Sequence, residues 1–328
     1  MTSEKKITFL PVLRKVVLKV AMEKTKEISN CLVLLATYNG EKYIEEQIDS
    51  ILAQKDVHIS ILIADDCSMD RTVEIIKDRY ANDKRVSYYI NEKNLGYSKN
   101  FMRLIDRVPL YKYDYICLSD QDDVWEADKV ISGIRKLEEN GDKLPALYSS
   151  NLMVVDEKLE IIKTMYNRDK IDPDNPLESY CTGCTVIFNN SLLALIKEYP
   201  MEKVDLPHDY IIKNIAQFCG RYIFDETSHI KYRQHSSNQI GVNDTHKFHR
   251  RVKKFFQPSY HNYSNLYKNI RDTYGLTMHE RYNDICYAMA NYRSELRSYC
   301  KLLFTNKYRK HTFSDNFAFK IAILFKKY

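Results

Sequence analysis

Glycine, proline and cysteine are scarce in this 328-residue chain, at eight copies each, and tryptophan occurs once. So few glycines and prolines exclude a collagen-like or low-complexity chain. Long hydrophobic runs are missing too, because no stretch reaches the roughly 18–20 uninterrupted apolar residues that a membrane-spanning helix needs. The hydrophobic fraction of 44% nevertheless supports a substantial core. Length and composition together predict one large α/β domain with an appendage, or two domains.

Paired cysteines are few, since only Cys181 and Cys184 form a CxxC sequence and no second pair completes a zinc site. The other cysteines are scattered, which favours reduced thiols and a cytoplasmic protein. The N-terminus lacks a signal-peptide pattern, because Arg14, Lys15 and Lys19 interrupt any apolar segment. We therefore expect a cytoplasmic location and no thiolate-bound metal.

Acidic residues are scarce towards the C-terminus. Residues 246–328 hold 17 Lys and Arg against 5 Asp and Glu, whereas residues 1–245 hold 33 against 39. This asymmetry predicts that the C-terminal region faces an anionic partner: membrane phospholipid, nucleic acid or a phosphate-bearing substrate. An amphipathic pattern at 7–24 fits a helix on a membrane surface as well as a helix that packs on the main domain.

Apolar runs and helical patterns alternate through the first half of the chain. The runs predict buried strands at 30–39, 58–66, 85–94 and 113–120, and helical patterns follow at 41–54, 69–81, 96–108 and 126–140. This alternation predicts βαβ units in a doubly wound, mostly parallel sheet flanked by helices. Further strands are expected at 146–155, 184–189 and in short pieces over 221–233, and helices at 208–218, 246–256, 262–275, 278–305 and 314–327.

Polar side chains follow each of the four predicted parallel strands. The fourth strand ends in "SDQDDVW", which places Asp120, Asp122 and Asp123 within four positions. Each loop alone fits a turn or a helix cap, but open α/β sheets bind ligands at the carboxyl ends of their strands. Neither GxGxxG nor a P-loop follows the first strand. The crowded carboxylates therefore indicate a divalent cation, Mg²⁺ or Mn²⁺, that bridges the protein to a diphosphate.

Four of these segments, taken in order, carry a family resemblance. "LLATYNGEKYIEEQIDSILAQ", "IADDCSMDRT", "NLGYSKNF" and "CLSDQDDVWEADKV" resemble the donor-binding motifs of family 2 glycosyltransferases with the GT-A fold. "SDQDDVW", "HDY" at 208–210 and "YRQHSSNQIG" at 232–241 resemble the bacterial rhamnosyltransferase-like branch. The resemblance covers roughly residues 30–242. With it, the chain divides into an N-terminal helix (1–29), a GT-A domain (30–245) and a basic helical region (246–328).

The resemblance implies how a nucleotide-sugar donor would be bound. The nucleotide would contact Thr37, Tyr38, Asn39, Asp66, Asn94, Gly96 and Lys99. Asp66 would accept a hydrogen bond from the imide of a uracil or thymine base. Asp120 and Asp122 would form the DXD pair, with Asp122 the direct metal ligand, and Asp123 would contact the sugar. His235 falls where related enzymes supply a metal or phosphate contact, although a structural loop histidine is the alternative.

The resemblance also implies a base and a reaction. Inverting members place a carboxylate at the start of a helix, and the matching residue here is Asp209, which would take the proton from the acceptor hydroxyl. Its alternative role is that of a helix cap. His208 departs from the broad family, which commonly has Glu there, and agrees with the rhamnosyltransferase branch. The CxxC then falls on the acceptor-side strand as a packing feature.

The predicted function is that of an inverting, metal-dependent glycosyltransferase of cell-surface polysaccharide biosynthesis. The expected donor is dTDP-L-rhamnose, with a UDP-hexose as the alternative, and the expected acceptor is a lipid-linked saccharide. We expect peripheral contact with the inner face of the cell membrane, or a homodimer formed through the same helices, and no nucleic-acid partner. A nucleotidyltransferase is the rival class, but "ATYNG" lacks the Gly-rich basic signature that it needs.

Overall fold

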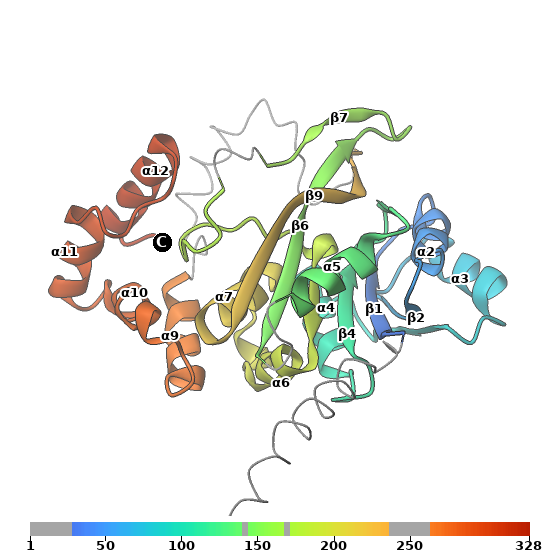
Figure 1. Ribbon diagram of the computed structural model, residues 1–328, viewed down its shortest axis with the longest axis horizontal. Helices are drawn as coiled ribbons and strands as arrows, with labels where there is room; N and C mark the ends of the chain where they lie inside the picture. Colours follow the sequence, from blue (N-terminus) through green and yellow to red (C-terminus); the bar gives the residue numbers. More distant parts are fainter. Residues whose placement is uncertain (1–27, 140–143, 167–170, 236–262) are drawn as a thin grey trace, which may run out of the picture.

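A computed structural model describes residues 28–139, 144–166, 171–235 and 263–328, and Figure 1 shows their arrangement. The helices predicted at 7–24 and 246–256 lie outside these residues. A nine-stranded sheet has the order β3-β2-β1-β4-β8-β6-β9-β5, and β7 pairs with β6. Helices cover both faces of the sheet, and the C-terminal helices stand together at one end of the molecule. The predicted α/β fold with a helical extension is confirmed.

The first half of the sheet is parallel, as the alternating pattern predicts. Its strands are β1 (Asn30–Thr37), β2 (His58–Asp65), β3 (Val86–Ile90) and β4 (Tyr115–Ser119). The helices of this half are α2 (Ile44–Leu52), α3 (Thr72–Tyr80), α4 (Tyr97–Asp106) and α5 (Lys129–Glu138). Leu32 to Leu35 in β1 are all buried, because a central parallel strand is covered on both faces. This burial explains why the run is continuously apolar.

The second half of the sheet is mixed. Its strands are β5 (Val124–Trp125), β6 (Ala146–Val155), β7 (Ile161–Thr164), β8 (Ile187–Asn189) and β9 (Arg221–Arg233). Strand β8 runs antiparallel to β4 and β6, whereas β9 runs parallel to β6. The short pieces expected at 221–233 form one strand, which stays paired with β6 across two register shifts. Strands β5 and β7 were not predicted, because two to four residues carry too little periodicity. The nine-residue helix α6 (Asn190–Glu198) was not predicted either.

Two other segments differ from the sequence prediction. The strand expected at 184–189 begins instead as a 3₁₀ turn, Gly183–Thr185, and continues as β8. The single helix expected at 278–305 is two helices, α10 (Glu280–Asn291) and α11 (Leu296–Phe304). Helical periodicity continues across the break, so the apolar pattern alone could not locate it.

The C-terminal helices share a hydrophobic core with the sheet. They are α9 (Tyr263–Tyr274), α10, α11 and α12 (Phe313–Leu324), and they follow α7 (His208–Cys219). One buried cluster contains Leu34 of β1, Phe101 of α4, Ile212 of α7, Tyr267 of α9 and Phe319 of α12. A second cluster packs α2, α3 and α5 on the opposite face of the sheet. Because the first cluster is continuous, the C-terminal helices support α7, which carries part of the candidate site.

Candidate active site

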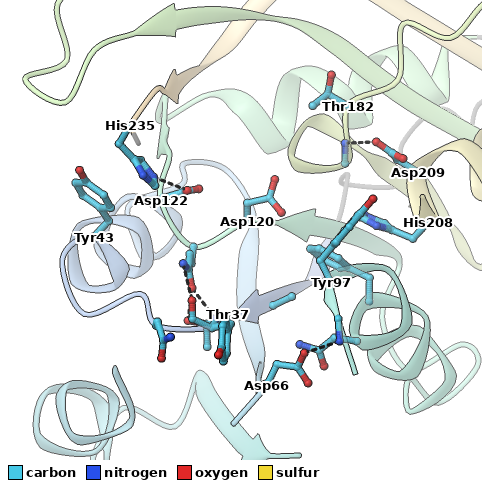
Figure 2. A pocket seen from close by; sticks show the side chains of 18 of the residues that line it. Thr37, Tyr43, Asp66, Tyr97, Asp120, Asp122, Thr182, His208, Asp209 and His235 are labelled. Atoms are coloured by element: carbon cyan, nitrogen blue, oxygen red, sulfur yellow. Dashed lines mark hydrogen bonds and ion pairs between the residues drawn. The ribbon is translucent and has the colours of Figure 1, made fainter. Parts of the chain in front are cut away.

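A cavity of about 560 Å³ lies at the carboxyl ends of β1, β2 and β4. Ten of the twelve site residues selected from the sequence line it: Thr37, Tyr38, Asn39, Asp66, Asn94, Gly96, Asp120, Asp122, Asp209 and His235. Figure 2 shows Thr37 and Asp66 at one end of the cavity and Asp209 at the other, with Asp120 between them. The loops that were expected to meet at one edge of the sheet therefore do so.

The two remaining residues, Lys99 and Asp123, are not part of the cavity lining. Helix α4 turns Tyr97, Asn100 and Phe101 towards the cavity, and Lys99 lies at a neighbouring depression. Asp123 is 1% exposed, and one of its carboxylate oxygens accepts a hydrogen bond from the backbone N–H of Arg233 at 3.1 Å. Asp123 therefore points into the protein just before β5, whereas Asp122 lines the cavity.

Asp66 organises the loop that follows β3. Its carboxylate accepts hydrogen bonds from the backbone N–H groups of Leu95 and Gly96 at 2.8 Å and from the side chain of Asn91 at 2.8 Å. The φ angle of Gly96 is +78°, a conformation that favours glycine, and it brings the turn onto Asp66. A carboxylate has about four acceptor positions. Three donors already bind this carboxylate, so the imide N–H of a nucleotide base would share the Asp66 oxygens with this turn.

Gln121 lines the cavity and connects two loops, although the sequence analysis did not select it. Its side-chain oxygen accepts hydrogen bonds from the Thr37 hydroxyl at 2.6 Å and from the Tyr38 backbone N–H at 2.7 Å. Its side-chain nitrogen donates to the Tyr38 carbonyl at 3.1 Å. The loop after β4 is thereby fixed to the loop after β1. The position of Gln121 between the acidic residues of "SDQDD" is the one feature of the sequence that could have indicated a place in the site.

Asp122 and His235 form a close pair on one wall of the cavity (Figure 2). The Nε2 atom of His235 lies 2.8 Å from a carboxylate oxygen of Asp122. The imidazole lies against the ring of Tyr43, with the ring centroids 4.9 Å apart. The guanidinium of Arg233 lies over the same ring at 4.6 Å, and its Nε atom donates to the Asp122 carbonyl. These contacts fix the orientation of the pair.

Asp120 faces both this pair and the opposite wall. Burial, together with the negative charges of Asp122 and Asp209, raises the pKa of Asp120 to about 7. The protein by itself therefore disfavours an ionised Asp120, and a bound cation would relieve the repulsion. Ligand atoms of Asp120, Asp123 and Cys184 also lie within 4.8 Å of one another. Burial holds the pKa of the Cys184 thiol well above its usual range, so oxygen atoms are the better donors here.

Asp209 stands in the first turn of α7, on the wall opposite Asp122. Its carboxylate accepts backbone hydrogen bonds from Tyr210 at 2.7 Å and from Gly183 at 3.2 Å. Burial raises the pKa of Asp209 to about 6, and the two N–H donors limit that rise. A carboxylate that titrates near 6 is ionised at neutral pH and still accepts a proton readily, which suits a general base.

Further residues that line the cavity were not predicted from the sequence. They include Lys42, Tyr43, Tyr97, Glu157, Thr182 and Tyr232. Lys42 pairs with Glu157 across 2.6 Å and bridges the region after β1 to the loop after β6. The sequence held no signal for this contact, because 115 positions separate the two residues.

The sheet order, the carboxylate-lined cavity and the added C-terminal helices define a GT-A-type transferase. Residues 32–196 match the family profile described as Glycosyl transferase family 2. The dTDP-rhamnosyl transferase RfbG of Shigella flexneri is 34% identical over 223 residues, which cover 65% of this chain and 75% of that protein. The chain belongs to glycosyl transferase family 2, is a glycosyltransferase and resembles the rhamnosyltransferases.

More distant relatives agree with this assignment. The putative teichuronic acid biosynthesis glycosyltransferase TuaG of Bacillus subtilis (strain 168) is 24% identical, over 47% of this chain and 60% of that protein. Among solved structures, S. aureus TarS 1-349 in complex with UDP-GlcNAc superposes with a TM-score of 0.56 at 15% identity, over 90% of this chain and 79% of that one. The same fragment in complex with UDP gives a TM-score of 0.54 at 16% identity, over 85% of this chain and 76% of that one. This likeness establishes the shared fold.

Proposed function

We propose that this protein transfers L-rhamnose from dTDP-L-rhamnose to a lipid-linked saccharide, with inversion at the anomeric carbon. The observation that carries the proposal is the arrangement of Asp120, Asp122 and Asp209 around one cavity, two on the loop after β4 and one on α7. The similarity to a dTDP-rhamnosyl transferase favours this donor. TarS structures with UDP and UDP-GlcNAc support a UDP-hexose as the second candidate.

In the proposed mechanism, the two ends of the cavity have different roles. The loops with Thr37, Asp66 and Asn94 would bind the nucleotide, held in place by the hydrogen bonds of Gln121 and Asp66. At the opposite end, Asp209 would accept the proton of the acceptor hydroxyl as that oxygen attacks the sugar. Since Gly183 and Tyr210 orient the Asp209 carboxylate, it is held ready for this transfer.

The residues present fit a divalent metal ion, which we propose is Mg²⁺ or Mn²⁺. Asp120 and Asp122 would hold it, with His235 as a further ligand or as a contact to the phosphates, and all three line the cavity. Burial and the neighbouring charges of Asp122 and Asp209 raise the pKa of Asp120, and a cation bound here would offset both effects. When bound, the ion would neutralise charge on the departing nucleoside diphosphate.

A donor screen tests the proposed activity. Purified protein should release nucleoside diphosphate from dTDP-L-rhamnose faster than from UDP-glucose, UDP-galactose or UDP-N-acetylglucosamine, with membrane-extracted saccharide lipid as acceptor. Preference for one UDP-sugar would establish the second candidate. A protein that releases diphosphate from none of them, with Mg²⁺ or Mn²⁺ present, would contradict the proposal.

We further propose that the C-terminal helices rest on an anionic membrane surface. Phe304, Phe313, Phe317 and Phe325 are 59–86% exposed. The segment 296–328 holds eight Lys and Arg against one acidic residue. Exposed aromatic side chains among basic ones suit the interface of an anionic bilayer. In the part of the chain that the structure describes, no helix combines the length and apolar character needed to cross a membrane.

Replacing both Phe313 and Phe317 with serine should weaken binding to phosphatidylglycerol vesicles by about a hundredfold or more, because each buried aromatic ring contributes about 1.5–3 kcal/mol. Cosedimentation measures this. A deletion of 314–328 is a poorer test, since it also removes the buried Phe319 and Ile323. Unchanged vesicle binding would contradict the membrane proposal. If the double variant instead dissociates a dimer, the face is an interface between copies. Binding to duplex DNA is not expected.

A further inference from the structure

His208 is a buried polar side chain on the cavity wall to which the proposed mechanism gives no role. It is the first residue of α7, is 4% exposed and lines the cavity next to Asp209. Its imidazole stacks on the ring of Phe101, with the centroids 4.0 Å apart and an interplanar angle of 22°. The ring of Tyr97 meets it edge-on at 6.1 Å. The two aromatic contacts fix the plane of the imidazole, and Figure 2 shows His208 beside Tyr97.

Neither ring nitrogen of His208 has a hydrogen-bond partner among the described residues. A buried polar atom without a partner costs stability, so packing alone would favour phenylalanine at this position. Stacking on Phe101 would serve a phenylalanine ring equally well. A histidine whose polar atoms are unused in the protein is therefore better explained by a ligand that uses them.

The surroundings define what such a ligand group must be. Burial lowers the pKa of His208 to about 3, so the imidazole is neutral and offers one N–H donor and one acceptor nitrogen. The Nε2 edge lies close against Gly183, where a Cβ atom would be only 2.7 Å from Nε2, so only glycine fits beside this imidazole. A neutral ring is unsuited to a phosphate, which would favour a charged donor. A hydroxyl group both donates and accepts, and it matches the imidazole.

We propose that His208 hydrogen-bonds a hydroxyl group of a sugar bound in the cavity and so contributes to sugar specificity. This inference rests on the proposed function, because it assumes that a sugar occupies the space between Asp120 and Asp209. The hydroxyl belongs either to the transferred sugar or to the acceptor sugar, since both meet at Asp209. In either case, a sugar that lacks this hydroxyl is bound less tightly, because the imidazole then remains unpaired.

The test uses His208→Phe in the full-length protein, with binding of dTDP-L-rhamnose and of dTDP measured separately by calorimetry. We expect about tenfold weaker binding of the nucleotide sugar, unchanged binding of dTDP, and a melting temperature equal to or above that of the wild type. That combination separates a lost ligand contact from a lost packing contact. If donor binding and donor hydrolysis are unchanged while transfer to the saccharide acceptor falls about tenfold, the hydroxyl is the acceptor's.

His279→Phe is the matched control. The Nε2 atom of His279 lies 2.7 Å from the Gly220 carbonyl, so this variant should lower the melting temperature and leave sugar binding unchanged. The inference is overturned if His208→Phe behaves as the wild type in all assays, or if it weakens dTDP and the nucleotide sugar equally and melts at a lower temperature. A wild-type protein that binds no nucleotide sugar contradicts the proposed function itself, which is a separate result.

Discussion

Replacing Asp209 with asparagine is expected to lower the rate of sugar transfer about a thousandfold while leaving the affinity for the donor within twofold of the wild type. The amide is nearly the same size and keeps an oxygen that can accept the Tyr210 N–H. It cannot accept a proton from the acceptor hydroxyl, and a positioned base contributes about 10²–10⁴ in rate. Transfer assays and calorimetry with the nucleotide sugar measure the two quantities separately.

The pH profile should identify the same group. Because the pKa of Asp209 is raised to about 6, the carboxylate is protonated and inactive as a base at pH 5 and ionised at pH 7. The value of kcat/KM should therefore rise between pH 5 and 7 and then level off. The residual activity of Asp209→Asn should lack this rise. Asp205→Asn, four residues earlier on the surface, is the control and should match the wild type. Full transfer activity in Asp209→Asn would assign the base to another residue.

Replacing Asp122 with alanine should weaken metal-dependent binding of the donor by at least about a hundredfold. Its carboxylate faces the cavity and is held by His235, so its loss removes a proposed metal ligand and leaves the imidazole without this partner. Titration of dTDP in the presence of Mn²⁺ and, separately, of EDTA measures the effect. The variant and the wild type should bind dTDP equally weakly in EDTA.

Asp128→Ala offers a matched control for this variant. Asp128 also pairs with a histidine, His229, at 3.2 Å, but it does not line the cavity. Its loss should leave Mn²⁺-dependent binding unchanged. Retention of that binding in Asp122→Ala would remove Asp122 from the metal site.

Most of the candidate site could be predicted, because its location depends on the order of the strands and not on individual side-chain contacts. The carboxyl ends of parallel neighbouring strands meet at one edge of a sheet, so residues that follow β1, β2 and β4 must lie near one another. Asp66, Asp120 and Asp122 satisfy this rule. The prediction that Asp123 contacts the sugar is not matched by the cavity lining, because the Asp123 carboxylate accepts a hydrogen bond from the Arg233 backbone inside the protein. Asp123 is therefore buried, although its sequence context resembles that of Asp122.

Helix α4 also shows that the sequence did not predict which side chains face the cavity. A helix turns its successive side chains by about 100°, so only some residues of "GYSKNF" can face the cavity. Tyr97, Asn100 and Phe101 share one face, and Lys99 lies off it. The choice of face depends on how α4 packs against β1, which its own sequence does not specify.

The sequence alone determined the alternating βαβ half, its burial pattern and the acidic strand ends, because local periodicity and the geometry of parallel sheets fix these features. Only the tertiary structure decided the mixed half, where β9 lies between β6 and β5, strands far from it in the chain. It also decided the contacts of Gln121, the pairing of Asp122 with His235 across 113 positions and the unpartnered state of His208. Such contacts join residues that no local pattern connects. They form only when the free energy of the whole core selects one packing.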